Sequence, residues 1–207
     1  MRFPLIVFDF DGTLVDSFER AVAIMRRIGP GLGLKPFDDL DAARSMPTKQ
    51  FFKTIGVTFW KLPKLMRAFH AAAAEDAADL VLFPGWPPVL AELAEKGHQL
   101  GILSSNSEAN IRATLMANGV EHHFSFVVGY PKLFGKAKAI RRIVRQQKVD
   151  RERLLYVGDE VRDVDAAKKA KVSSAACKWG FQTESLLATA NPDWLLGEPS
   201  ELVKIVS

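Results

Sequence analysis

The sequence predicts an α/β fold in which helices cover both faces of a parallel sheet and a helical module interrupts the core. Short apolar runs alternate with helical patterns over residues 85–207, the arrangement typical of parallel sheets. Another apolar run, Phe3–Phe8, lies near the start of the chain. Between them, residues 16–84 carry helical and loop signals without a clear strand pattern. We therefore expect a discontinuous core, 1–15 and 85–207, and a helical insertion, 16–84.

Periodicity and chain-breaking residues define the elements in order. Apolar residues recur at helical spacing from Ser17 to Ile28, and glycine and proline directly after Ile28 end that helix. The alanine-rich stretch 62–80 predicts a long helix. Shorter helices are expected at 39–44 and 49–55 of the insertion. The expected core strands are 99–103, 124–128, 154–157, 172–177 and 194–196, and the expected core helices are 89–96, 108–118, 136–147 and 163–171.

The composition is that of an ordinary globular protein, with 207 residues, 48% hydrophobic and 25% charged. The net charge of +4 is mildly basic, but no basic run with interleaved aromatic residues predicts a nucleic-acid partner. The single cysteine, Cys177, excludes an intrachain disulfide and is expected to be packed in a strand. No apolar run is long enough for a signal peptide or a membrane span. We expect a cytoplasmic protein with no membrane partner; its oligomeric state does not follow from the sequence.

The first core strand ends in two carboxylates, Asp9 and Asp11. Side chains alternate along a strand, so these two share a side. Two buried like charges are unfavourable unless a cation or a proton shares the site. Oxygen ligands of this kind suit Mg²⁺. The sequence therefore predicts a magnesium site and a metal-assisted reaction at the carboxyl end of this strand.

Two other expected strands also end in polar residues or glycine. Ser105-Asn106 follows the strand at 99–103, and Gly158-Asp159 follows the strand at 154–157. In open parallel sheets, sites form at the carboxyl ends of strands near the topological switch point. Asp163 lies one helical turn beyond Asp159. We expect these residues to converge with the first strand's carboxylates.

Four segments in this order resemble the signatures of the haloacid-dehalogenase-like hydrolase superfamily. They are Asp9-Phe10-Asp11-Gly12-Thr13, the strand ending at Ser105, Lys136 at a helix start, and Gly158-Asp159 with Asp163. The resemblance implies a Rossmann-like parallel sheet core with an inserted all-helical cap domain, in the phosphoglycolate-phosphatase-like branch. The chain departs from the pattern at Ala137, where members often have proline, and at Lys171, where glycine is common.

The resemblance also implies residue roles. Asp9 is expected to attack phosphorus and form an aspartyl-phosphate, and Asp11 to move protons. The phosphate-binding residues it implies are Gly12, Thr13, Ser105, Asn106 and Lys136, the last neutralising charge on the nucleophile. The Mg²⁺ ligands it implies are Asp9, Asp11 through its backbone carbonyl, Asp159, and Asp163 directly or through water.

These features predict a magnesium-dependent phosphatase that acts on a small phosphorylated metabolite, with phosphoglycolate as one candidate. A phosphomutase with the same signatures is an alternative, and a catalytically silent binding module is another. Ser104 is the alternative to Ser105 as the phosphate-binding hydroxyl, and Lys138 is the alternative to Lys136 as the charge-neutralising lysine.

The insertion is expected to select the substrate. Its basic residues Arg44, Lys49 and Lys53 are candidates to meet an anionic substrate tail, although a surface position is the more common one for any such residue. Its aromatic residues are expected to serve packing rather than ligand contacts; they are Phe51, Phe52, Phe59, Trp60 and Phe69.

Overall fold

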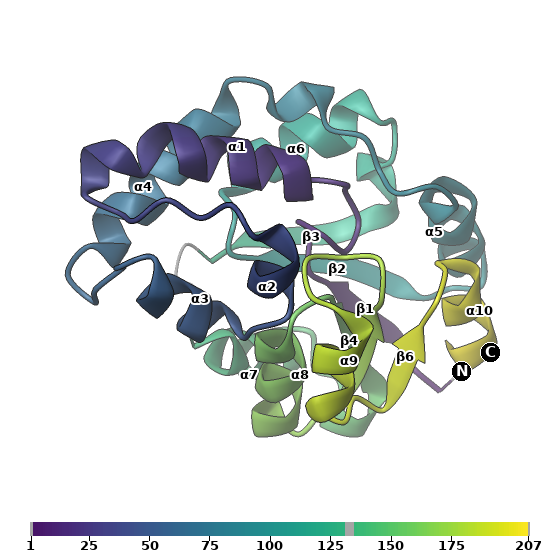
Figure 1. The fold of residues 1–207 in the computed structure, drawn as a ribbon. Helices are drawn as coiled ribbons and strands as arrows, with labels where there is room; N and C mark the ends of the chain where they lie inside the picture. Colours follow the sequence, from purple (N-terminus) through teal and green to yellow (C-terminus); the bar gives the residue numbers. More distant parts are fainter. Residues whose placement is uncertain (1, 131–134, 207) are drawn as a thin grey trace.

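The computed structural model describes residues 2–130 and 135–206, and its centre is a six-stranded sheet in which every pairing is parallel (Figure 1). The strand order is β3-β2-β1-β4-β5-β6. The strands are β1 (Leu5–Phe8), β2 (Gln99–Ser104), β3 (Phe124–Gly129), β4 (Leu154–Gly158), β5 (Ser173–Cys177) and β6 (Trp194–Leu196). The parallel α/β core expected from the sequence is confirmed.

Helices cover both faces of the sheet. On one face lie α5 (Trp86–Glu95), α6 (Glu108–Ala117) and α10 (Ser200–Val206); on the other lie α7 (Lys136–Gln146) and α8 (Val161–Ala170), with α9 (Glu184–Thr189) beside α8. Ile6 and Phe8 of β1 belong to the first apolar layer, and Leu5 and Val7 to the second. Because both faces are buried, β1 is apolar at every position.

The sheet brings three strand ends together. The N-terminal strand β1 lies between β2 and β4, and Phe8 is in register with Ile102 of β2 and Val157 of β4. The chain fills one half of the sheet with β2 and β3 and the other half with β4, β5 and β6. The boundary at β1 is therefore the topological switch point, where sites form in sheets of this kind.

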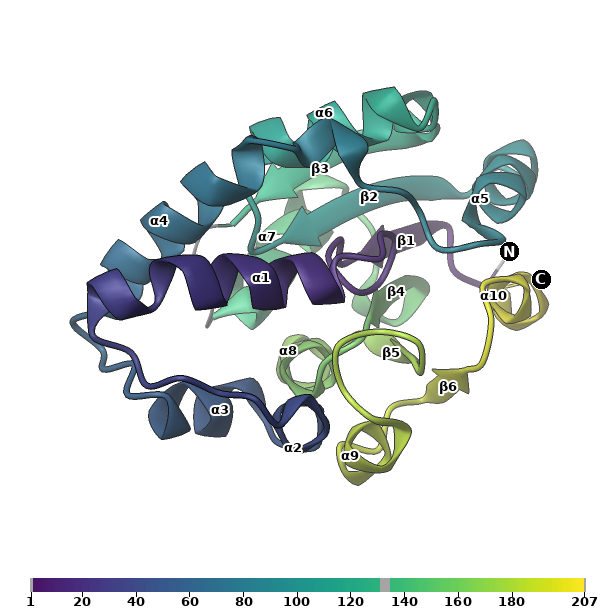
Figure 2. The same cartoon turned by 45° about the horizontal axis from the view of Figure 1, so that its top comes forward.

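The helical insertion forms a cap over this end of the core. Its helices are α1 (Phe18–Ile28), α2 (Leu40–Arg44), α3 (Thr48–Thr54) and α4 (Leu62–Ala74). Figure 2 shows α1 alongside α4, with α2 and α3 facing them. Residues 16–84 are all described and contain no strand. The cap has apolar clusters of its own, around Ile24 and around Met25 with Leu65. The expected all-helical cap is confirmed, while its boundaries at 16 and 84 stay a prediction.

The chain enters and leaves the cap through two segments that run side by side. The backbone N–H of Asp16 donates to the carbonyl of Val81 at 3.1 Å, and that of Phe83 to the carbonyl of Leu14 at 2.9 Å. Val15 also forms an isolated bridge with Leu82. The chain therefore passes from the core to the cap and back at one place, directly after the loop that follows β1.

Three predicted helices differ from the structure by more than one residue at one end. The helix expected over 62–80 ends at Ala74, where the side chain of Arg20 donates to the Ala73 carbonyl, and a 3₁₀ turn follows at Ala77–Asp79. α5 begins at Trp86 rather than at 89, because prolines are well suited to the first helical turn. α8 begins before Asp163, since Glu160 and Asp163 form a capping box.

The sequence analysis also missed two helices, α9 and α10. They are 6 and 7 residues long, and so short a segment gives a weak periodic signal. No helix in the described part of the chain combines the length and apolar character that crossing a membrane requires.

Trp86 holds the loop that follows β1 against the core. Its side chain is fully buried, its indole N–H donates to the Thr13 carbonyl at 2.8 Å, and its ring meets Phe8 edge-on with centroids 5.4 Å apart. We expect Trp86→Phe to lower the free energy of unfolding by about 2 kcal/mol, through a lost hydrogen bond and a cavity. Urea unfolding measures this change. The control is Trp60→Phe, at a side chain that is 86% exposed; an equal loss there would contradict the assignment.

Candidate active site

A buried ammonium joins two carboxylates at the switch point. Lys136 begins α7, and its Nζ donates to Asp9 Oδ2 at 2.7 Å and to Asp163 Oδ1 at 2.5 Å. All three side chains are at most 4% exposed. Burial disfavours the charged ammonium, but the charges of Asp163 and Asp9 outweigh it and raise the pKa of Lys136. Lys136 is therefore charged, and it is the lysine that reaches the site, because Lys138 is exposed.

Asp9 continues the line of β1 by one residue. Its backbone N–H donates to the Val157 carbonyl at 2.8 Å, and its Oδ1 accepts from the Phe10 N–H at 2.8 Å. Burial opposes ionisation, but the nearby ammonium of Lys136 prevails and lowers the pKa of Asp9. Asp9 is thus a buried carboxylate held in its ionised form.

Three buried carboxylates lie close together beside the ammonium of Lys136. Oxygen atoms of Asp9, Asp159 and Asp163 all lie within 4.8 Å of one another. Burial and the neighbouring acids raise the pKa of Asp159 well above its usual range, and burial raises that of Asp163 to about 6. Three acids outnumber Lys136, and the nearby Arg162 is paired with Glu160 at 2.6 Å, so negative charge is in excess. The set offers only oxygen ligands and therefore fits a divalent cation such as Mg²⁺.

The loop after β5 closes on Asp159. The N–H of Phe181 donates to Asp159 Oδ2 at 2.7 Å, and the Thr13 hydroxyl donates to Oδ1 at 2.8 Å. Gly12 has a φ of +73°, and a Cβ there would lie 2.3 Å from Asp159 Oδ2. A Cβ at Gly180 would lie 2.2 Å from Asp159 Cβ. The sequence analysis missed residues 178–183; Gly180, shortly after an apolar strand, was the available signal.

Asp11 lies beside this cluster, and its side chain has a different partner. Its Oδ2 accepts from Asn106 Nδ2 at 2.9 Å. Asn106 Oδ1 in turn accepts from the Ser107 N–H at 2.8 Å and from Asn110 Nδ2 at 3.2 Å, which orients the amide group toward Asp11. Burial and the charge of Asp9 raise the pKa of Asp11. The protonated form of Asp11 is therefore favoured relative to that of an exposed aspartate.

The residues expected to bind phosphate are distributed around the pair Asp9 and Asp11. The N–H of Gly12 donates to the Val15 carbonyl at 3.0 Å and that of Thr13 to the Phe10 carbonyl at 3.2 Å, which closes the turn after β1. Ser105 lines the cavity described below, whereas the Ser104 hydroxyl is buried and accepts from the Asn106 N–H at 3.3 Å. These positions favour Ser105 over Ser104 as the exposed hydroxyl.

The cap contacts the core through the segment that joins α2 to α3. Arg44 Nη2 donates to the Gly180 carbonyl at 2.8 Å, and Gln182 Nε2 donates to the Met46 carbonyl at 3.3 Å. The Thr48 hydroxyl donates to the carboxylate of Glu160, next to Asp159. These contacts hold the cap against the two loops that surround Asp159.

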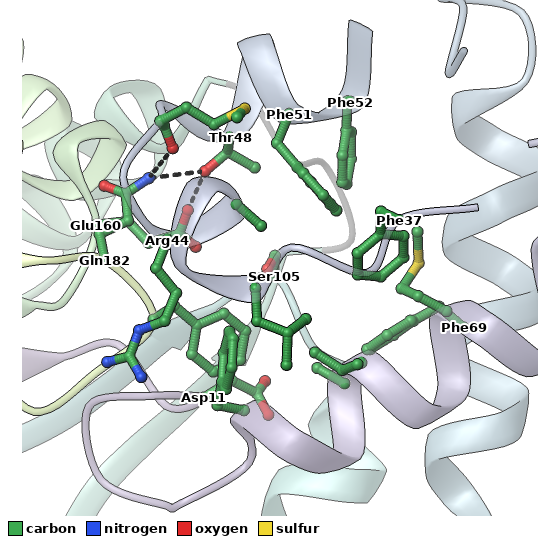
Figure 3. A pocket seen from close by; sticks show the side chains of 18 of the residues that line it. Asp11, Phe37, Arg44, Thr48, Phe51, Phe52, Phe69, Ser105, Glu160 and Gln182 are labelled. Carbon is green, nitrogen blue, oxygen red and sulfur yellow. Dashed lines mark hydrogen bonds between the residues drawn. The ribbon is translucent and has the colours of Figure 1, made fainter. Parts of the chain in front are cut away.

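A cavity of about 170 Å³ lies between the cap and the core, and Asp11 and Ser105 line it on the core side (Figure 3). Among the expected cap residues, Arg44, Phe51, Phe52 and Phe69 line it as well. Lys49 and Lys53 line a different cleft. Phe59 and Trp60 do not line it; they are 79% and 86% exposed and contact each other edge-on, with ring centroids 5.5 Å apart.

Cys177 is buried at the end of β5, as expected for a packed thiol. Burial and the nearby carboxylates raise the pKa of this thiol well above its usual range. The thiol form therefore prevails, and such a group is a poor nucleophile.

Residues 6–177 match the family described as haloacid dehalogenase-like hydrolase. A phosphoglycolate phosphatase from Synechococcus elongatus is 37% identical over 204 residues, which cover 98% of this chain and 96% of the relative.

Solved structures have the same fold. A protein from Clostridium acetobutylicum, described as a predicted phosphatase, superposes with a TM-score of 0.86 at 20% identity, covering 100% of this chain and 99% of the other. CbbY from Rhodobacter sphaeroides, solved in complex with phosphate, has a TM-score of 0.74 at 21% identity, covering 97% and 96%. The chain belongs to the haloacid dehalogenase-like hydrolases, in the branch that contains phosphoglycolate phosphatases.

Proposed function

We propose that this chain is a Mg²⁺-dependent phosphatase that hydrolyses a small phosphorylated metabolite through an aspartyl-phosphate on Asp9. Its family and its 37% identical relative make it a phosphoric monoester hydrolase. The observation that carries the mechanism is the buried contact between Lys136 Nζ and Asp9 Oδ2 at 2.7 Å. A buried carboxylate kept ionised beside a protonatable second carboxylate has the properties of a nucleophile with its own acid.

In the first step, an oxygen of Asp9 attacks phosphorus while the bond from phosphorus to the ester oxygen breaks. Asp11 gives its proton to that departing oxygen, so the product is a neutral alcohol. Asn106 holds the Asp11 carboxyl for this transfer through its 2.9 Å hydrogen bond. Asp9 becomes an acyl phosphate, and Asp11 becomes a carboxylate.

In the second step, water attacks the phosphorus of the aspartyl-phosphate and gives a proton to the Asp11 carboxylate. The bond between phosphorus and Asp9 breaks, inorganic phosphate leaves, and both aspartates return to their starting forms. The ammonium of Lys136 stabilises the negative charge on Asp9 and on the phosphoryl oxygens in both steps.

The remaining residues position these groups. Ser105, at the cavity, is suited to donate to a phosphoryl oxygen. Asp9, Asp159, Asp163 and the backbone carbonyl of Asp11 would hold Mg²⁺, which when bound supplies positive charge to the phosphoryl oxygens. Direct contact of Gly12, Thr13 and Asn106 with phosphate stays a prediction.

Phosphoglycolate is one candidate substrate, because the relative from Synechococcus elongatus is a phosphoglycolate phosphatase.

The phosphomutase alternative differs from a phosphatase in the fate of the phosphoenzyme. A phosphomutase returns the phosphoryl group to a second hydroxyl, whereas a phosphatase releases it as inorganic phosphate. The silent binding module forms no phosphoenzyme at all.

Asp9→Asn is expected to lower kcat for p-nitrophenyl phosphate by roughly a thousandfold or more, because the amide cannot form the phosphoenzyme. The measurement is Mg²⁺-dependent release of both p-nitrophenol and inorganic phosphate. Trapping after acid quench, followed by peptide mass spectrometry, should place the phosphoryl group on Asp9 of the wild type. Asp165→Asn, at an exposed acid of α8, is the matched control. Undiminished turnover in Asp9→Asn would refute the mechanism; p-nitrophenol without inorganic phosphate would favour a phosphomutase.

Mg²⁺ should raise the midpoint of thermal unfolding of the wild-type protein, because a ligand of the folded state stabilises it. Asp159→Asn should reduce or abolish that increase, since the change removes a carboxylate from the buried three-acid cluster. Asp165→Asn again serves as the control and should keep the full increase. Calorimetry with and without Mg²⁺ measures the effect, and an equal increase in all three proteins would place the metal elsewhere.

A further inference from the structure

The cavity under the cap is where the organic part of the substrate must lie, if the proposed function is right. In that mechanism Asp11 protonates the ester oxygen, so the alcohol bonded to that oxygen extends away from Asp9 past Asp11. Asp11 and Ser105 line the core side of the cavity (Figure 3). The polarity and charge of the cavity walls therefore indicate which kind of alcohol the cavity accepts.

Apolar side chains from three cap helices and the loop before α2 form most of the wall. They are Phe18, Phe37, Phe51, Phe52, Met66 and Phe69. Rings meet edge-on at two places, Phe37 with Phe51 at 5.0 Å and Phe18 with Phe181 at 5.4 Å between centroids. An apolar group that enters gains the free energy of removing these surfaces from water. A cavity of about 150 Å³ accepts a benzene ring, and this one is about 170 Å³.

Three polar residues of the wall, Thr48, Glu160 and Gln182, already have protein partners. Gln182 accepts from the Val161 N–H at 2.6 Å and donates to the Met46 carbonyl at 3.3 Å. Thr48 donates to Glu160, which also accepts from Arg162 at 2.6 Å. Figure 3 shows Thr48, Glu160 and Gln182 gathered at one side, away from Phe37 and Phe69. These groups join the cap to the core rather than offer an anchor to a polar substrate.

The charge of the wall disfavours a second anionic group on the substrate. Among the described residues that line it, the charged ones are one cation, Arg44, and two acids, Asp11 and Glu160. Arg44 donates to the Gly180 carbonyl at 2.8 Å, and its guanidinium carbon lies 4.8 Å from the centre of the Phe18 ring. A carboxylate among Phe37, Phe52 and Phe69, away from the Arg44 guanidinium, would lose water without gaining a cation there (Figure 3). Phosphoglycolate carries such a carboxylate.

We propose that the substrates of this enzyme are phosphate monoesters of apolar alcohols, aliphatic or aromatic up to about the size of a benzene ring, in which the phosphate is the sole charged group. Specificity arises because the cap buries the hydrocarbon part of the alcohol. The carboxylated ester phosphoglycolate is a poorer substrate than a phosphate ester of equal length whose alcohol carries no charge.

The test compares primary alkyl phosphates, which share the same leaving-group chemistry. kcat/KM is measured with Mg²⁺ for ethyl, butyl and hexyl phosphate, for phosphoglycolate, and for hexyl phosphate with a terminal carboxylate. Each buried methylene should raise kcat/KM by roughly fourfold until the cavity is full. The terminal carboxylate should lower it by at least about tenfold. This series needs only the wild-type protein.

Met66→Lys supplies the test variant, since it places a cation on the wall with an unbranched side chain that is only one atom longer than that of methionine. It should reduce the gain from ethyl to hexyl phosphate and raise kcat/KM for the two carboxylated esters. Met116→Lys, on α6 at a side chain that is 66% exposed, is the control and should leave every ratio unchanged. Thermal unfolding establishes that both variants are folded.

The outcomes separate this inference from the proposed function. A flat alkyl series, or a preference for phosphoglycolate, overturns the inference; if Asp9→Asn still abolishes that activity, the phosphatase proposal stands. The inference is supported if kcat/KM of the wild type rises along the alkyl series and if Met66→Lys raises kcat/KM for the carboxylated esters. If the wild type hydrolyses none of the esters, both proposals are overturned.

Discussion

An excess of buried negative charge at the switch point of the sheet is the constraint on which this structure depends. Asp9, Asp159 and Asp163 lie within 4.8 Å of one another, and Lys136 is the ammonium among them. Isolated carboxylates are strongly disfavoured in such surroundings. The fold compensates by supplying hydrogen-bond donors from separate segments: Thr13 from the loop after β1, Phe181 from the loop after β5, and the backbone of Glu160 at 3.1 Å from Asp163. A divalent cation would complete this compensation.

The two carboxylates nearest the reaction differ because their neighbours differ. The ammonium of Lys136 outweighs burial and lowers the pKa of Asp9, whereas burial and the charge of Asp9 raise the pKa of Asp11, whose Asn106 partner carries no charge to oppose them. Two residues of one type, separated by a single position, thereby acquire opposite protonation preferences. The roles that we propose, Asp9 as nucleophile and Asp11 as acid, rest on this difference. The cap adds a third environment, because its aromatic side chains surround the cavity that would receive the leaving alcohol in this mechanism.

The catalytic end of the sheet was accessible to sequence reasoning because polar residues directly follow apolar strands. Asp9, Ser105 and Asp159 each occupy such a position, and parallel pairing brings strand ends together. Side-chain partners were less accessible. Nothing local indicates that Asn106 bonds to Asp11, or that Gly180 brings a distant loop against Asp159. The cap aromatics illustrate the same limit: Phe52 lines the cavity and Trp60 faces solvent, and only tertiary packing distinguishes them.

The paired segments at the base of the cap have an evolutionary consequence. Because the chain departs from Val15 and returns beside it at Leu82, the intervening residues can be lengthened, shortened or exchanged without altering how the strands pair. Insertions are tolerated where both ends lie close together. Natural variation can therefore change the ligand preference through the cap while the α/β core keeps the same reaction chemistry.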